Sequence, residues 1–399
     1  MSRTNKAWLP FFAALPLTAI AGLQPISDEQ MSEVTGQAFI SIDRQYHPDP
    51  NENTSYTRVN LGMDIEIQTN IDVLELGRYE RDSEKAGTSD VLINDFALGY
   101  INNQAYYQRN NKAARQYRPD GTAYAENEIV PFMIENPFFE FAFDESSNEV
   151  IGVRLGFGNA MGVLSGKIET LTGNVNIDII DRGEGLSQAS SSGNFFDQAI
   201  VLLTPLLASG SPLATKAQLV YGPNDPRRGE LDPIRAEYIG VPNGERFVLE
   251  DANSFTRWAL KNLIGWGSSS EIEVPNCSFF SCGAGDIYVY AEGCSVLGIE
   301  ACFDLDMYNS FPIGQVEEVN GERRLTGPAD GAFMSFQTKD LDWLKDVKKG
   351  DLTVDDFVRA TSGAFFNIPN GATEVNLNEA LNGTDRYRTE YIDRGRGLF

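Results

Sequence analysis

The amino-acid sequence predicts a mainly β protein with a minor helical part. We expect a long curved antiparallel β-sheet or a short β-solenoid-like region, with a few packed helices and a disulfide-stapled region. Three observations predict this class: strict alternation begins at Val59, a glycine-punctuated apolar pattern covers 137–180, and all four cysteines lie between Cys277 and Cys302. A period of two is the pattern of a strand with one dry face and one solvated face.

The first strand region shows this alternation over an unusual length. Its apolar positions are Val59, Leu61, Met63, Ile65, Ile67, Ile71 and Val73. At about 3.3 Å per residue, an unbroken run of this kind would be longer than most globular strands. We therefore expect it to bend or to split.

The second strand region begins with Phe139, Phe141 and Phe143 on alternate positions, followed by the turn-like residues 146–148. Further along, Leu-Ser-Gly-Lys-Ile ending at Ile168 is echoed by Leu-Thr-Gly-Asn-Val. Glycines at this spacing suit the corners of a curved sheet or a few turns of a solenoid. Two copies do not establish a repeat, and we favour the antiparallel sheet.

A linker-like stretch at 188–194, rich in Ser and Gly, predicts the domain boundary. We expect a β-rich N-terminal domain at 22–187 and a mixed β/α domain at 195–399, with the disulfide cluster at 277–302. The start of the second domain is strongly apolar but too short to span a bilayer. It is expected to be either a helix buried against the sheet or a contact segment for lipid or another hydrophobic ligand. The candidate hydrophobic contact residues are Phe195, Phe196, Ile200, Leu203 and Leu206.

The second half mixes helices and turns. Cap residues at 251–253 and the apolar spacing from Phe255 to Ile264 predict a helix that ends at Gly265, and further helices are expected at 341–347 and 353–360. Asn243-Gly244 and Asn320-Gly321 are hairpin signals, since both residues tolerate positive φ.

The cysteines predict two disulfides in an oxidising compartment. The candidates are Cys277, Cys282, Cys294 and Cys302. Three pairings are possible and the sequence does not choose among them. A zinc site is the rival, but the spacing lacks the C-x2-C pairs typical of one.

The segment from Tyr100 to Tyr124 is rich in Asn, Gln and Tyr and is basic within an acidic chain. A polar aromatic excursion between strands is expected to be a surface loop, or a contact surface for a glycan, an acidic partner or another copy of the protein. The candidate partner contacts are Tyr106, Tyr107, Arg109, Arg115, Tyr117 and Arg118.

The N-terminus predicts export. Arg3 and Lys6 precede an apolar run that ends in the small residues Ala19 and Ala21, which is the construction of a secretory signal peptide at 1–21. We therefore expect a surface, extracellular or periplasmic location, with no transmembrane span.

The residues that follow, 23–38, contain Ser-Asp-Glu-Gln-Met-Ser-Glu-Val-Thr-Gly-Gln-Ala. This block resembles the mature start of a group of exported, poorly characterised envelope or surface proteins of Gram-negative gammaproteobacteria, some of them loosely labelled as pilus-assembly proteins. The resemblance covers about a tenth of the chain. It implies an envelope or surface role and brings no catalytic residue with it.

The formal net charge of −25 argues against nucleic acids and anionic membranes as partners, because both would repel the chain. Such acidity suits salt tolerance or the collection of divalent cations. We expect no cofactor. Calcium is the alternative, with the oxygen-rich stretches at 49–52 and 126–128 as candidates, although they lack an EF-hand pattern.

The single histidine, His47, lies in a turn-like stretch. One histidine leaves little room for a Ser-His-Asp or Cys-His site and none for a centre built on several imidazoles. We expect no enzyme. The leading hypothesis is a non-enzymatic surface or matrix protein in adhesion, biofilm or surface-fibre assembly, which associates with itself or with an envelope partner. The alternatives are an envelope carrier or sensor of lipid or other hydrophobic molecules and a carboxylate-dependent polysaccharide hydrolase.

Overall fold

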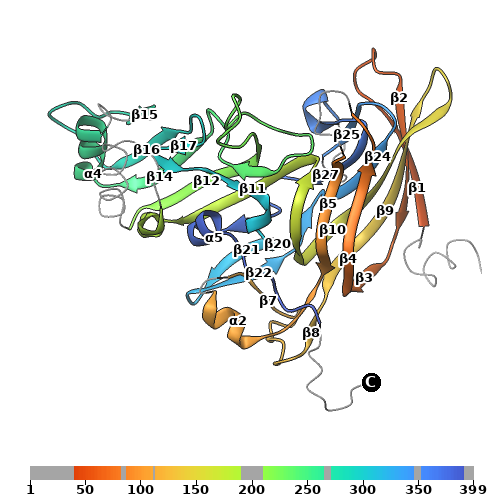
Figure 1. Ribbon diagram of the computed structural model, residues 1–399, viewed down its shortest axis with the longest axis horizontal. Helices are drawn as coiled ribbons and strands as arrows, with labels where there is room; N and C mark the ends of the chain where they lie inside the picture. The colour runs from red at the N-terminus through yellow and green to blue at the C-terminus, as the bar shows by residue number, and fades with distance from the viewer. Residues whose placement is uncertain are drawn as a thin grey trace, which may run out of the picture. The chain divides into compact units, whose positions relative to one another are not determined.

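The computed structural model describes residues 40–81, 87–110, 113–189, 210–264, 271–345 and 352–390. It confirms the predicted class: a large, mostly antiparallel sheet dominates, several small sheets accompany it, and the helices are few and short (Figure 1). Among the described residues the α-helices are α2 (Gln104–Arg109), α4 (Ser254–Ala259) and α5 (Leu377–Asn382). η1 (Gly183–Gln188), η3 (Leu305–Met307) and η4 (Val354–Asp356) are 3-10 helices, and η2 (Leu260–Ile264) is a short π-helix that follows α4.

Strands make up most of the regular structure. In chain order, the first are β1 (Ile40–Tyr46), β2 (Thr54–Leu61), β3 (Asp64–Ile67), β4 (Thr69–Arg78), β5 (Ser89–Leu98), β6 (Tyr100–Ile101), β7 (Arg115–Gln116), β8 (Ile129–Val130), β9 (Phe132–Asp144), β10 (Glu149–Leu171), β11 (Gly173–Arg182), β12 (Pro212–Val220), β13 (Tyr238–Gly240) and β14 (Arg246–Ala252). The others are β15 (Ile272–Glu273), β16 (Gly285–Tyr290), β17 (Ser295–Val296), β18 (Ile299–Glu300), β19 (Cys302–Asp304), β20 (Ser310–Ile313), β21 (Gln315–Val319), β22 (Glu322–Gly327), β23 (Ala329–Asp330), β24 (Phe333–Gln337), β25 (Leu341–Leu344), β26 (Phe357–Ala360), β27 (Gly363–Ile368) and β28 (Glu374–Val375).

The long alternating run splits, as expected, into β2, β3 and β4. β2 and β3 both pair with β9, whereas β4 pairs with β5. The predicted dry face is wrong in β2 and in β4: Val59 lies on the solvent-facing side of β2 while Arg58 is buried on the other side, and Ile71 and Val73 of β4 are exposed. In β4, Leu74 and Leu76 pack against the main core instead. Because β4 pairs with β5 instead of β9, the alternation in β4 does not place the same set of residues on the covered face.

β10 is the central strand, and it settles the choice between a curved sheet and a solenoid. Its first part pairs antiparallel with β9 and β24, and its last part with β5 and β20. Gly162 and Gly166 lie at the transition with φ near +153°. A side chain at Gly162 would collide with Phe132, because its Cβ would lie 2.7 Å from that ring. The glycines therefore mark the bend of one curved, mostly antiparallel sheet.

Turns and helices were predicted with mixed success. The β9–β10 hairpin and the β21–β22 hairpin at Asn320-Gly321 are confirmed. Asn243-Gly244 forms a turn, but β13 and β14 each pair with β12 and not with each other. The predicted helix is confirmed as α4 and η2, with the Asn253 side chain as its cap, whereas Asp251 and Ala252 end strand β14.

The helices predicted at 341–347 and 353–360 are wrong. Leu341–Leu344 and Phe357–Ala360 are the antiparallel strands β25 and β26, and only one helical turn, η4, precedes β26. The physical reason is packing: Leu341, Trp343 and Leu344 are all at most 3% exposed, in a second core against the large sheet. Most of the predicted boundary at 188–194 lies outside the described residues, so the domain division stays a prediction.

Candidate interaction surface

One face of the sheet formed by β1, β2, β9, β10 and β24 carries large apolar side chains in contact with solvent. Six of them are between 41% and 68% exposed: Ile40, Ile42, Tyr46, Phe139, Val150 and Phe336. We call this surface the open face. Exposed apolar patches of this kind commonly mark sites of protein contact.

The strand register places these six residues on the same side of the sheet. Ile42 is opposite Val59, which is opposite Phe139 in the next ladder. Phe336 is opposite Val153, which is opposite Phe141, and Val150 is opposite Phe143. Directly opposed residues share a face, as do alternate residues of one strand. The open face is therefore continuous from β1 to β24.

The other face of the same strands is closed. Arg154 is fully buried there, where its Nε–H donates to Glu140 at 2.6 Å and its guanidinium lies about 5.0 Å from the Trp343 ring. Arg58 pairs with the same carboxylate at 2.9 Å. The β25–β26 hairpin covers this side, and Arg154 also donates to the Leu344 carbonyl. No described element closes the open face in the same way.

β1 is an edge strand of this sheet. Among the described residues it pairs only with β2, and six of its seven residues are exposed. The His47 N–H donates to the Thr54 carbonyl at 3.0 Å just beyond the strand. Because hydrogen-bonded pairs alternate along an antiparallel ladder, the odd-numbered residues of β1 bond to β2. The N–H and C=O groups of the even-numbered residues Ile40, Ile42, Arg44 and Tyr46 point away from β2.

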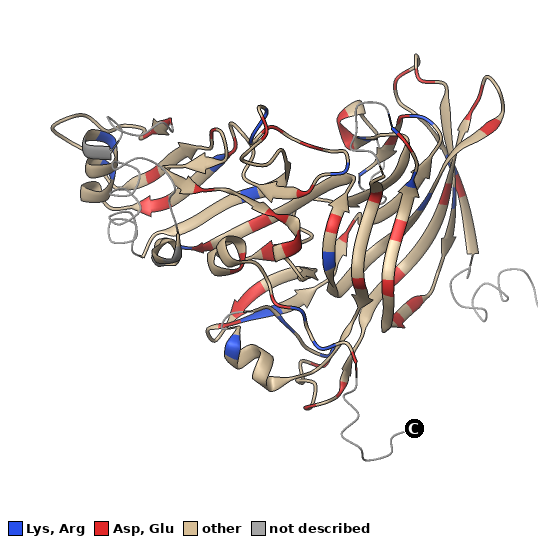
Figure 2. Ribbon diagram, in the orientation of Figure 1, with Lys and Arg blue, Asp and Glu red and all other residues tan. Residues whose placement is uncertain are grey.

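The charges of β1 already have partners on its own sheet. Arg44 pairs with Glu145 at 2.7 Å, and the Asn60 amide donates to Asp43 at 2.6 Å. Acidic residues are spread over many elements of the molecule instead of gathering in one patch (Figure 2). Of the two charges of β1, that of Arg44 is balanced by Glu145, whereas Asp43 keeps its charge and accepts a hydrogen bond from a neutral amide.

His47 follows β1 in the predicted turn, yet its side chain is buried. Its ring lies 4.6 Å from that of Phe357, and its Nδ1 accepts the Asp49 N–H at 3.2 Å. Nε2 lies 3.9 Å from the Asp342 carboxylate. These contacts place the single histidine against the second core.

The predicted partner contacts divide into a buried and an accessible set. Tyr106 on α2 is 4% exposed and stacks on Tyr387 with ring centroids 3.9 Å apart, and Tyr107 shares a hydrogen bond of 2.7 Å with Tyr100. Burial raises the pKa of Tyr100 to about 12. Tyr106 therefore offers no accessible surface to a partner. The sequence pattern did not predict the contact with Tyr387, which is far from Tyr106 along the chain.

The arginines of this segment lie closer to solvent. Arg109 is exposed, whereas Arg115 and Tyr117 both contact Glu322 on β22. Arg118 pairs with Glu128 and lies 4.5 Å from the Tyr124 ring, in the wall of a polar groove of about 420 Å³. Of the predicted contacts, Arg118 alone lines this groove. The contact role of the accessible residues stays a prediction.

The disulfides pair neighbours in sequence. Cys277 bonds Cys282, and Cys294 bonds Cys302. Disulfides of this kind indicate an oxidising environment outside the cytoplasm. In the described part of the chain, no helix is long and apolar enough to cross a bilayer.

An apolar cavity of about 50 Å³ lies among β11, β13, β17 and α5. Ile177, Ile239, Val296 and Leu377 are among its lining residues. Thr215 also lines it, and its buried hydroxyl has no hydrogen-bond partner. The predicted hydrophobic contacts Phe195, Phe196, Ile200, Leu203 and Leu206 lie outside the described residues.

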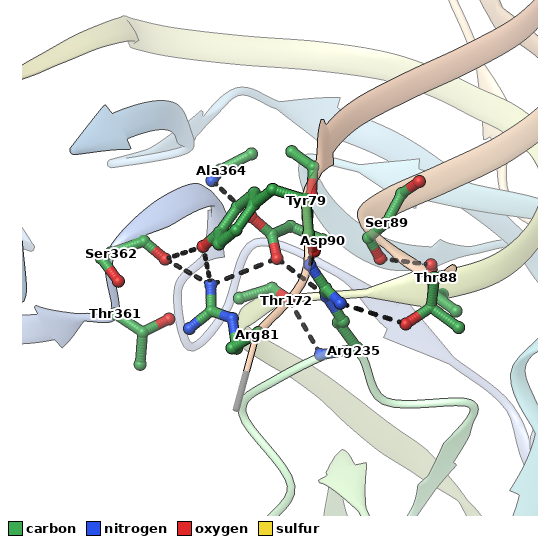
Figure 3. A network of polar contacts seen from close by, with 12 residues as sticks. Tyr79, Arg81, Thr88, Ser89, Asp90, Thr172, Arg235, Thr361, Ser362 and Ala364 are labelled. Atoms are coloured by element: carbon green, nitrogen blue, oxygen red, sulfur yellow. Dashed lines mark hydrogen bonds and ion pairs between the residues drawn. The ribbon is translucent and has the colours of Figure 1, made fainter. Parts of the chain in front are cut away.

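A buried carboxylate joins distant parts of the sheet (Figure 3). Asp90 accepts from the Arg235 Nε–H at 3.0 Å, from Arg81 at 3.2 Å and from the Ala364 N–H at 2.9 Å. Arg235 also donates to the Tyr79 carbonyl. Because the Asp90 side chain is fully buried and has three donors, the arrangement ties β5 to β27 and offers no reactive group to a ligand. Among the residues described, no three His, Cys, Asp or Glu side chains converge as metal ligands.

The fold and these contacts define a class: a disulfide-bonded, mainly β protein of an oxidising compartment. The chain is similar over residues 1–52 to a family described as a family of unknown function, DUF6160. This stretch includes the predicted leader, the block at 23–38 and the whole of β1. No curated protein and no solved structure matches the chain.

Proposed function

We propose that this protein is a non-enzymatic, exported surface or matrix protein that associates with copies of itself in adhesion, biofilm or surface-fibre assembly. The observation that carries the proposal is the continuity of the open face with the unpaired edge of β1. Edge strands usually carry protection such as inward charges, prolines or a covering element. β1 has no proline, and its charged residues Asp43 and Arg44 already have partners within the molecule. Its open-face side chains Ile40, Ile42 and Tyr46 are large and exposed.

β4 is a second edge strand. Among the described residues it pairs only with β5, and Ile71 and Val73 are 40% and 52% exposed. A molecule with two different contact edges can associate beyond a closed dimer, because each copy then joins two neighbours. This supports fibre or matrix assembly over a single closed pair.

The experiment is fractionation of producing cells, with the wild type compared to Ile42→Lys and Phe280→Lys. Phe280 is 93% exposed on the disulfide-bonded region and serves as the matched control. We expect the wild type and Phe280→Lys in surface or extracellular aggregates and Ile42→Lys as dispersed protein. A wild type found only as dispersed periplasmic monomer contradicts the proposal.

A second candidate function is the binding of a small hydrophobic molecule, favoured by the Thr215 hydroxyl in the apolar cavity. Buried hydroxyls normally have a partner, and a ligand oxygen would supply one. Mass spectrometry of molecules that copurify with the native protein tests this candidate. A bound apolar molecule that is absent from Thr215→Val preparations supports it, and an empty wild type contradicts it.

A further inference from the structure

We propose that two copies of this protein pair antiparallel through their β1 strands, with Ile42 directly opposite Ile42 of the second copy. The inference rests on the proposed self-association and adds the contact and its register. The new ladder would join two sheets across a twofold axis and extend the open face over both.

The backbone restricts the possible registers. The even-numbered residues of β1 direct their N–H and C=O groups to the free edge, because the odd-numbered residues bond to β2. In a new antiparallel ladder, even-numbered residues must therefore oppose even-numbered residues. This condition also keeps both open faces on the same side, since directly opposed residues share a face. If one strand slipped by a single residue, even-numbered residues would oppose odd-numbered ones. The edge hydrogen bonds would then be lost, and the two open faces would lie on opposite sides.

Charge then selects among the symmetric registers centred on the middle of the strand. Centring the pair on Asp43 opposes two carboxylates, and centring it on Arg44 opposes two guanidiniums. Like charges in direct opposition destabilise a ladder. Centring the pair on Ile42 opposes two apolar side chains and is the remaining register of these three.

The other pairs in this register are complementary. Ser41 is opposite Asp43, so that its hydroxyl can donate to a carboxylate oxygen. Ile40 is opposite Arg44, whose aliphatic stem can cover it while the guanidinium stays with Glu145. β1 is thus self-complementary, which favours a second copy of this chain as the partner.

An open strand edge also argues against a lipid surface as the occupant. Apolar chains cover side chains but cannot accept or donate the hydrogen bonds that β1 directs outward. Another strand satisfies both the backbone and the apolar side chains.

The test uses three single-cysteine variants of the full exported protein: Ile42→Cys, Asp43→Cys and Arg44→Cys. The four native cysteines are all disulfide-bonded, so each variant adds one thiol. In the proposed register, the two Cα atoms at position 42 are about 5.5 Å apart, within disulfide range. The copies of position 43 lie roughly 8 Å apart and those of position 44 farther, beyond that range.

We expect mild oxidation to convert most of the Ile42→Cys protein to a covalent dimer, at least about tenfold more than either other variant. Preferential cross-linking at 43 or 44 overturns the register. Equal cross-linking at all three positions, or none in a protein that sediments as an oligomer, overturns the β1 pairing and leaves the proposed function standing. A wild type that is monomeric at every concentration overturns both.

Discussion

Arg154 and Glu140 form an ion pair in which both side chains are at most 1% exposed, with Nε and Oε2 2.6 Å apart. The pair lies under the β25–β26 hairpin, on the covered face of the strands whose other face is open. A buried ion pair is costly to break, because the remaining charge has no water to solvate it.

We therefore expect Glu140→Ala to lower the free energy of unfolding by about 3–5 kcal/mol. Urea denaturation measures the change. Arg44→Ala removes the solvent-exposed partner of Glu145 and is the matched control, with little change expected. Equal, small effects of both substitutions would show that the covered face does not depend on its ion pair.

The tyrosine cluster predicts a loss of stability in alkali. Burial raises the pKa values of Tyr100, Tyr106, Tyr107 and Tyr387, that of Tyr100 from 10.0 to about 12. The unfolded chain loses these protons first, so the stabilisation is complete below pH 10 and is lost as the pH rises toward 12 and beyond. Each tyrosine contributes a slope of about 1.4 kcal/mol per pH unit in this window.

Urea titrations at a series of pH values, together with tyrosinate absorbance, measure this slope. Tyr387→Phe should reduce the slope by one group, so that the difference in stability between wild type and variant narrows above pH 10. If the stability of the two proteins fell with pH at the same slope, Tyr387 would not be a buried tyrosine with a raised pKa.

The bend in β10 depends on Gly162. Gly162→Ala would place a methyl group against Phe132 at a φ that side chains rarely adopt, and we expect a loss of about 1–3 kcal/mol. Gly283→Ala is the control, since nothing lies within 4 Å of its Cβ position and its φ is not in the positive range. Thermal unfolding of the two variants measures the difference. A Gly162→Ala protein as stable as Gly283→Ala would refute a steric role for this glycine.

The disulfide pairing predicts the peptide map of the unreduced protein. Linked peptides should contain Cys277 with Cys282 and Cys294 with Cys302. Replacing the second pair by alanine should cost about 2–3 kcal/mol for a loop of this size. Crossed linkages in the native protein would contradict the structure of this region.

Self-association should strengthen with salt. The chain has a formal net charge of −25, and two copies therefore repel each other over distances that salt shortens from about 10 Å at 0.1 M to about 3 Å at 1 M. We expect the dissociation constant to fall several-fold between these concentrations, measured by sedimentation. Weaker association at high salt would indicate ion pairs, and not apolar strands, at the contact.

The sequence predicted the fold class because alternation and turn residues are local signals. Val59 to Ile67 and the Phe139 series lie in the strands expected of them. Leu341 to Leu344 were mistaken for a helix, since a short apolar run fits either structure and only packing against the sheet decides. The split at Gln68 between β3 and β4 was expected, but the new partner strand was not.

The candidate site could be predicted only in part. Tyr106 and Tyr107 are conspicuous in the sequence, but their burial depends on Tyr387, which no local pattern connects to them. The open face depends on the register of five strands that are scattered along the chain. Single-strand patterns show which residues alternate, but they do not show which face stays uncovered.

Sedimentation equilibrium of the purified exported protein tests the central claim, association through the exposed β1 edge, most directly. We predict that the wild type and Phe280→Lys form species larger than a dimer with rising concentration, and that Ile42→Lys, which keeps only the β4 edge, forms nothing larger than a dimer and has unchanged circular dichroism. A wild type that is monomeric throughout, or an Ile42→Lys protein that associates as strongly as the wild type, would contradict the account.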